Sequence, residues 1–181
     1  MNRYAAFIRG IMPTNPNMRN EKLRAVFEGL GFEQVASLLT SGNIVFHSEE
    51  TDTAALESRI QQALHAELGI PGGTLVRSRE QLRAMVDADP FPGLTHCRET
   101  YLTVTFVREA PAQLPELPSG GIESAVELVG YDQGAGAVLS VIDNSDPGTP
   151  SFMAWLEKVY GKDITTRTFL TVQKTLKKLN S

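Results

Sequence analysis

The sequence predicts an α+β protein whose two halves repeat one order of elements. The order strand, helix, hairpin of two strands, helix, strand fits residues 3–78 and recurs less regularly over residues 101–167. The chain has 181 residues and 41% hydrophobic residues, enough for two small domains that each bury a modest core. A βαββαβ unit folds as an antiparallel four-stranded sheet with both helices on one face. We therefore expect two ferredoxin-like domains.

Hydrophobic spacing places the elements of the first half. Unbroken apolar runs predict buried strands, apolar residues three and four apart predict helices, and Gly or Pro clusters mark the breaks. Asn17 is expected to cap the first helix, and Thr40–Asn43 to form a tight hairpin turn. The expected elements are strands at Tyr4–Ile8, Phe32–Leu39, Ile44–His47 and Thr74–Arg77, helices at Asn17–Leu30 and Asp52–Leu68, and a short helix after Ser78.

The second half is predicted to be a degenerate copy. Pro111, Pro115, Pro118 and Gly120–Gly121 stand where the first half has its first helix, and they permit at most one helical turn. The remaining expected elements are strands at Tyr101–Val107, Ser124–Val129, Ala137–Ile142 and Lys162–Arg167, a helix from Thr149–Pro150, and an extra terminal helix at 169–179. The predicted domains are residues 1–78 and 101–181, joined by a helical connector and loop at 79–100.

Composition excludes several classes of function. A net charge of −4 argues against a general binder of nucleic acid or anionic membranes, because such affinity comes from clustered Lys and Arg. The single Cys97 excludes an internal disulfide and multi-cysteine zinc motifs, and the three His residues lack metal-ligand spacing. No apolar run is long enough to cross a membrane. We expect a cytoplasmic protein with no cofactor and no metal site.

One end of the predicted N-terminal sheet gathers candidate ligand-binding residues. In the predicted topology the loop after the first strand, the start of the first helix and the hairpin turn lie at this end. A helix start favours an anion, Arg provides a bidentate charge, and Asn and Ser add neutral donors. The alternative is that these residues serve only as turn and cap residues. The candidates are Arg9, Gly10, Asn17, Ser41, Gly42 and Asn43.

Several segments resemble a bacterial family, the domain of unknown function 1697 family. The resemblance rests on Arg9–Ile11, Ser41–Phe46, Val76–Ser78 and Thr165–Arg167, followed by three single positions, Thr171, Val172 and Lys174. It implies a pair of ferredoxin-like domains and brings no assigned activity. The family-motif positions that it implies in the second half are Thr166, Arg167, Thr171 and Lys174. The chain departs from the family pattern at Met12–Pro16, where members usually have a Gly-rich stretch.

Three functional hypotheses follow. The first is a small anionic ligand, bearing phosphate or carboxylate, bound at the Arg9 end of the N-terminal sheet, a site expected only in that half. The second is a phosphohydrolase that resembles acylphosphatases, with Arg9 as charge clamp and Asn43 positioning water. The third is a protein-interaction or RNA-binding module that uses Tyr4 and Phe7, although nucleic acid is disfavoured by the charge. Whether the protein is an enzyme, its oligomeric state and the relative orientation of the two domains stay open.

Overall fold

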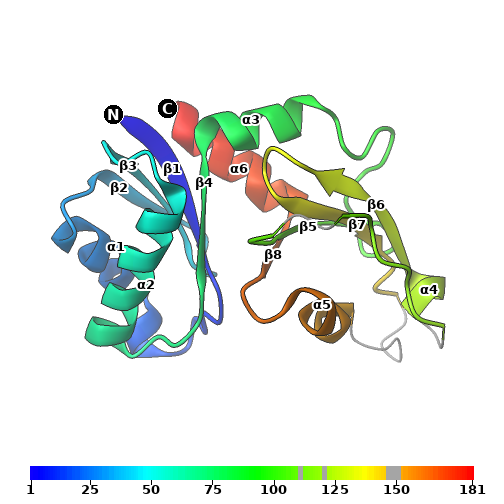
Figure 1. Cartoon of the computed structure of the whole chain (residues 1–181), viewed down its shortest axis with the longest axis horizontal. Coiled ribbons are helices and arrows are strands. Elements are labelled where there is room, and N and C mark those ends of the chain that lie inside the picture. The colour runs from blue at the N-terminus through cyan, green and yellow to red at the C-terminus, as the bar shows by residue number, and fades with distance from the viewer. Residues whose placement is uncertain (110–111, 120–121, 146–151) are drawn as a thin grey trace. The chain divides into compact units, whose positions relative to one another are not determined.

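The chain forms two four-stranded antiparallel sheets, with strand orders β2-β3-β1-β4 and β6-β7-β5-β8 (Figure 1). The structure is a computed structural model that describes residues 1–109, 112–119, 122–145 and 152–181. These residues group into two compact units, unit 1 with residues 1–82 and 174–181, and unit 2 with residues 83–173. The prediction of an α+β protein with two ferredoxin-like arrangements is confirmed.

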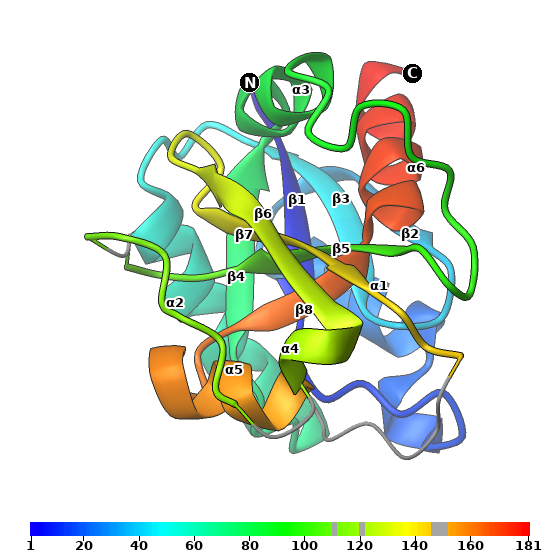
Figure 2. The ribbon, with the colours of Figure 1, turned by 90° about the vertical axis from the view of Figure 1, so that its right-hand side faces the viewer.

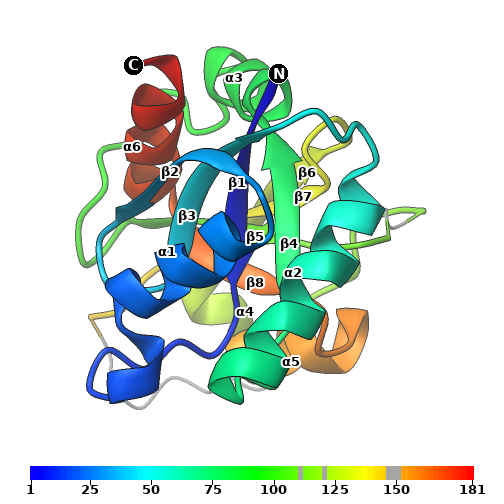
Figure 3. The same cartoon turned by 90° about the vertical axis from the view of Figure 1, so that its left-hand side faces the viewer.

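Unit 1 has its helices α1 and α2 on one face of its sheet (Figure 3). Alternate residues of β1, among them Tyr4, Ala6 and Ile8, pack against Phe27 and Ile60 of these helices. Successive strand side chains point to opposite faces of the sheet, so these alternate residues share the face that the apolar stripes of the two helices cover, and a single core results. The elements are β1 Asn2–Ile8, the 3₁₀ turn η1 Pro16–Met18, α1 Asn20–Gly29, β2 Glu33–Leu38, β3 Asn43–Ser48, α2 Thr53–Leu68, β4 Thr74–Ser78 and α3 Arg79–Asp87, of which the part from Arg83 on is assigned to unit 2.

The predicted cap of the first helix is wrong. Asn17 lies inside the 3₁₀ turn, where its N–H donates to the Oδ1 atom of Asn15 at 2.9 Å. Asn15 therefore caps the 3₁₀ turn, and Pro16 occupies the position that tolerates a missing N–H. The N-cap position of the α-helix is Arg19, which makes no side-chain capping hydrogen bond. The α-helix begins three residues after Asn17, at Asn20. A local proline turn thus competes successfully with earlier helix initiation.

Unit 2 keeps the sheet but shortens the helical part, as predicted (Figure 2). The four-residue α4 is the helix described between its first two strands. The expected helix start at Thr149–Pro150, and Pro111 and Gly120–Gly121 in the degenerate segment, lie outside the described residues. The elements are β5 Tyr101–Phe106, α4 Ile122–Ala125, β6 Val126–Asp132, β7 Ala137–Ile142, α5 Phe152–Tyr160, β8 Thr165–Thr168 and α6 Phe169–Asn180.

The repeat includes one helix more than the predicted βαββαβ order. Each fourth strand, β4 and β8, runs directly into a helix, α3 and α6, through a hydroxyl residue that caps it. Ser78 and Gln81 form a reciprocal capping box, with hydrogen bonds of 2.8 and 3.1 Å. Thr168 accepts from the N–H of Thr171 at 3.2 Å. The extra terminal helix is therefore the counterpart of the helix that follows the first repeat.

The end of α6 belongs to unit 1. The Arg3 side chain on β1 donates from Nη1 to the carbonyl oxygen of Leu179 at 2.6 Å. Leu179 also lines a small cavity with Val45 of β3 and Ala36 of β2.

Among the described residues, none of the helices is long and apolar enough to cross a membrane.

Candidate functional site

Three loops of unit 1 meet at the end of β1. The N–H of Ile8 donates to the carbonyl of Gly42 in the β2–β3 hairpin at 2.9 Å. The N–H of Arg9 donates to the carbonyl of Gly73 in the α2–β4 loop, also at 2.9 Å. A Cβ on Gly72 would lie 2.2 Å from the Arg9 carbonyl oxygen, so this approach requires glycine. The hairpin loop thus binds Ile8 and the α2–β4 loop binds Arg9, which is half-buried.

Gly42 allows the hairpin to reach β1. Its φ angle is +80°, and a Cβ there would lie 2.6 Å from Cγ1 of Ile11 and 3.0 Å from the Ile8 carbonyl oxygen. Both the left-handed conformation and the close contact exclude a side chain. Gly10 also has a positive φ, +76°, but a Cβ there would meet nothing within 4 Å. Gly42 is therefore needed for close packing and Gly10 for the turn alone.

Asn43 holds the hairpin closed from inside. Its side chain is fully buried, and its Nδ2 atom donates to the Leu38 carbonyl and to Ser41 Oγ, each at 3.2 Å. Ser41 itself is exposed at the hairpin tip. Asn43 therefore positions Ser41 from within the hairpin. Of these two side chains, only that of Ser41 is accessible to solvent.

The segment that follows Arg9 carries positive charge. Between residues 9 and 24 the sequence has four basic residues, Arg9, Arg19, Lys22 and Arg24, against one acidic residue. The exposed Asn17 accepts a hydrogen bond from Lys22 Nζ at 3.0 Å. Local charge therefore favours an anion at this end of the sheet, in a chain whose net charge is negative.

The start of α1 is tied to the same hairpin. The Nδ2 atom of Asn20, the first residue of α1, donates to the Leu39 carbonyl oxygen at 2.6 Å. Leu39 adopts a left-handed φ of +56° at the hairpin turn. The positive end of the helix dipole thus lies beside the hairpin, as the topology predicts.

The family-motif positions Thr166, Arg167 and Thr171 belong to unit 2 and not to the unit that carries Arg9, whereas Lys174 is an exposed residue of unit 1. Thr166 Oγ1 lies 2.9 Å from Thr105 Oγ1 across the β5–β8 pair. Arg167 Nη1 donates to Thr165 Oγ1 at 2.7 Å and to the Thr166 carbonyl at 3.0 Å.

Burial lowers the pKa of Arg167 to about 10, because desolvation disfavours the charged form. Thr171 is buried next to Thr168 at the start of α6. Thr166 and Thr171 therefore make hydrogen bonds to other residues of unit 2. Arg167 is a desolvated cation on an edge strand.

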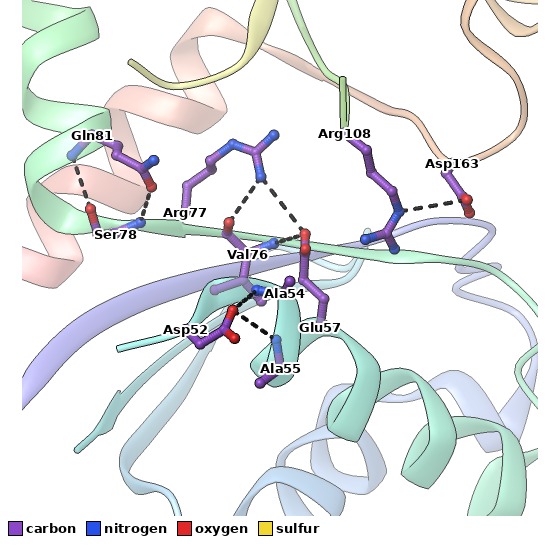
Figure 4. Close-up of polar contacts among 10 residues, drawn as sticks. All are labelled: Asp52, Ala54, Ala55, Glu57, Val76, Arg77, Ser78, Gln81, Arg108 and Asp163. Atoms are coloured by element: carbon purple, nitrogen blue, oxygen red, sulfur yellow. Dashed lines mark hydrogen bonds and ion pairs between the residues drawn. The ribbon is translucent and has the colours of Figure 1, made fainter. Parts of the chain in front are cut away.

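Sequence reasoning missed a buried ion pair at the edge of the first sheet (Figure 4). Glu57 on α2 accepts from the N–H of Val76 on β4 at 3.0 Å, and its Oε2 lies 3.8 Å from Arg77 Nη1. The side chains of Glu57 and Arg77 are 8% and 9% exposed. The available signal was an acidic residue beside the apolar stripe of α2, which includes Leu56 and Ile60. This pair satisfies an edge N–H and fixes α2 against β4.

Comparison with known proteins identifies a family of unknown function and a similar solved structure. A family model described as "Protein of unknown function (DUF1697)" matches residues 1–121. The solved structure of conserved bacterial protein SP0830 from Streptococcus pneumoniae is similar, with 19% sequence identity and a TM-score of 0.65. The match covers 98% of each chain. At this identity the similarity shows a shared fold. No curated protein matches the chain.

Proposed function

We propose that this chain, which belongs to the DUF1697 family as its motifs predicted, is a cytoplasmic protein that binds a small phosphate- or carboxylate-bearing ligand at the Arg9 end of the unit 1 sheet. The observation that carries the proposal is the meeting of three loops at Arg9. The N–H of Arg9 donates to the Gly73 carbonyl and the N–H of the preceding Ile8 donates to the Gly42 carbonyl, each at 2.9 Å. A held main chain limits the positions that the guanidinium can take. Less conformational entropy is then lost when a ligand binds.

The groups around Arg9 suit an anion. Arginine forms charge-assisted and often bidentate hydrogen bonds with carboxylate and phosphate oxygens. Ser41 is exposed on the hairpin and Lys22 is exposed on α1, and each can donate a further hydrogen bond. The start of α1 contributes a favourable dipole beside that hairpin. Each of these donors suits an oxygen of a phosphate or carboxylate group.

The other two hypotheses have less support. A phosphohydrolase that resembles acylphosphatases requires Asn43 to position a water molecule, yet this side chain is fully buried and donates within the hairpin. An RNA-binding sheet requires exposed aromatic rings. Tyr4 and Phe7 are 3% and 0% exposed, which leaves no ring surface of these two residues for stacking on bases. A protein-interaction role stays a prediction.

Titration of the protein with inorganic phosphate, acetyl phosphate and citrate tests the proposal. Arg9→Ala is expected to weaken binding of the tightest of these probes at least tenfold, because a charge-assisted hydrogen bond contributes about 1.5–3 kcal/mol. Arg79→Ala is the matched control, since Arg79 follows β4 at the opposite end of the sheet and pairs with Glu80. It is expected to bind as the unmodified protein does.

Equal affinity of the unmodified protein and the Arg9→Ala variant for all three probes contradicts the proposal. A fresh solution of acetyl phosphate also tests the enzyme hypothesis directly. Release of phosphate by the pure protein, lost on Arg9→Ala substitution, would favour the phosphohydrolase over simple binding.

A further inference from the structure

Unit 2 repeats the hydrogen bond between the hairpin and the residue before Arg9. The N–H of Val107 donates to the carbonyl of Gly136 at 2.9 Å, as the N–H of Ile8 does to that of Gly42. Both glycines are left-handed, with φ angles of +60° and +80°. Arg108 follows Val107 as Arg9 follows Ile8. Arg108 is therefore the counterpart of Arg9 in the second repeat, although a proline-rich segment replaces the first helix there.

Arg108 lines a cavity of about 460 Å³ in unit 2. This volume lies within the roughly 300–1,000 Å³ range of small-molecule sites. One part of the wall is charged and consists of Arg108, Glu109 and Asp163, and another part is apolar and consists of Val107, Pro115 and Val159. Gln113 and Tyr160 complete the lining. The cavity therefore suits a ligand with both charged ends and a short apolar middle.

The charges of this cavity differ from those around Arg9. Arg108 Nε lies 3.5 Å from Asp163 Oδ2, and the two side chains are 33% and 62% exposed (Figure 4). An exposed ion pair contributes only about 0–1 kcal/mol, so a ligand can compete for each member. Glu109 adds a second carboxylate to the wall. A ligand with only a negative charge would be repelled by two carboxylates, and a ligand with only a positive charge would be repelled by the guanidinium.

We propose that this cavity binds a small zwitterion, a compound that carries one carboxylate and one ammonium group, such as an amino acid. The ligand carboxylate pairs with the guanidinium of Arg108, and the ligand ammonium group pairs with the carboxylates of Asp163 and Glu109. The methylene groups between them pack against Val107 and Val159. This proposal concerns other residues than the anion site proposed for unit 1 and does not depend on it.

A probe series that separates the two charges tests the proposal. Glycine, 3-aminopropanoate, 4-aminobutanoate and 6-aminohexanoate are titrated against the full-length protein by heteronuclear NMR, alongside butanoate and butylamine. At least one zwitterion is expected to shift the amide signals of Arg108 and its neighbours. Its affinity is expected to exceed that of butanoate and of butylamine at least tenfold, because each single-charge probe loses one charge-assisted contact.

Three variants assign the contacts. Arg108→Gln and Asp163→Asn are each expected to weaken zwitterion binding about tenfold. Both side chains are exposed enough for the fold to be kept, which the thermal midpoint checks. Lys162→Gln changes an exposed charge next to Asp163 outside the cavity wall and is expected to leave binding unchanged. Absence of binding by every zwitterion at millimolar concentration, or equal binding of butanoate or butylamine, overturns the proposal. Unchanged affinity in both cavity variants overturns it as well.

Discussion

Removal of the Glu57 carboxylate is the sharpest test of how unit 1 is held together. Glu57 Oε2 accepts from the N–H of Val76 at 3.0 Å and lies 3.8 Å from Arg77 Nη1. Because both charged side chains are more than nine-tenths buried, water compensates poorly for a lost partner. Glu57→Ala is therefore expected to destabilise the protein strongly. From the sequence alone, an acidic residue on an amphipathic helix is expected at the exposed surface.

The magnitude follows from the two contacts. Loss of the acceptor for a buried N–H costs about 1–3 kcal/mol, and removal of one member of a buried ion pair costs about 3–5 kcal/mol in all. The 3.8 Å separation is long for a direct hydrogen bond, so the lower end, about 3 kcal/mol, is expected for Glu57→Ala. Glu57→Gln keeps an oxygen acceptor for Val76 and removes only the charge. It is expected to cost about 1–2 kcal/mol.

Urea unfolding followed by circular dichroism measures these losses, with Glu67→Ala as the control. Glu67 lies on the same helix and is exposed, so its replacement is expected to change the free energy of unfolding by less than about 0.5 kcal/mol. Hydrogen exchange provides a local readout, since the Val76 amide is expected to exchange faster in Glu57→Ala. A loss below about 1 kcal/mol in Glu57→Ala, or a loss equal to that of Glu67→Ala, would refute the reasoning.

Three further outcomes are expected. Gly72→Ala is expected to cost about 1–3 kcal/mol by thermal unfolding, because its Cβ would lie 2.2 Å from the Arg9 carbonyl oxygen, whereas Gly134→Ala meets only an ordinary 3.6 Å contact and is expected to be neutral. Tyr160→Phe is expected to leave the free energy of unfolding unchanged or to raise it by up to about 1 kcal/mol. The reason is that the buried Tyr160 hydroxyl has no hydrogen-bond partner among the described residues. A loss of stability in this variant would contradict the prediction. Burial, and then nearby positive charge, lowers the pKa of His47 below its usual 6.5. The unfolded chain therefore takes up this proton first, so stability is expected to fall as the pH drops through 6.5, and an unchanged pH dependence in His47→Gln would contradict that cause.

The order of the elements was readable from the sequence because period-two and helical spacing of apolar residues survive in both repeats. The same order predicts that Arg9 and the hairpin at Ser41–Gly42 lie at one sheet end, since antiparallel pairing and right-handed crossovers leave few other arrangements. The structure places these residues side by side through the Ile8–Gly42 and Arg9–Gly73 hydrogen bonds. Their role in ligand binding stays a prediction.

Competing local structures limited how precisely the sequence predicted the start of the first helix and the hairpin turn. The sequence favoured Asn17 as the helix cap, but Asn15 and Pro16 form a competing 3₁₀ turn of similar local preference. Asn43 was expected in the turn because Asn tolerates positive φ, yet it begins β3 and points inward. Such choices depend on differences of about 1 kcal/mol, which a single sequence does not resolve.

By itself, the sequence determined the α+β class, the duplication, the family and the sheet end at which Arg9 lies, because these depend on patterns that neighbouring residues carry. The tertiary structure alone decided which polar groups pair across distant segments. Glu57 meets Arg77 because α2 packs along the edge of β4, and Arg108 lines a cavity with Asp163 because β5 ends near the loop before β8. Such contacts depend on the packing of segments far apart in the chain, which local spacing does not specify.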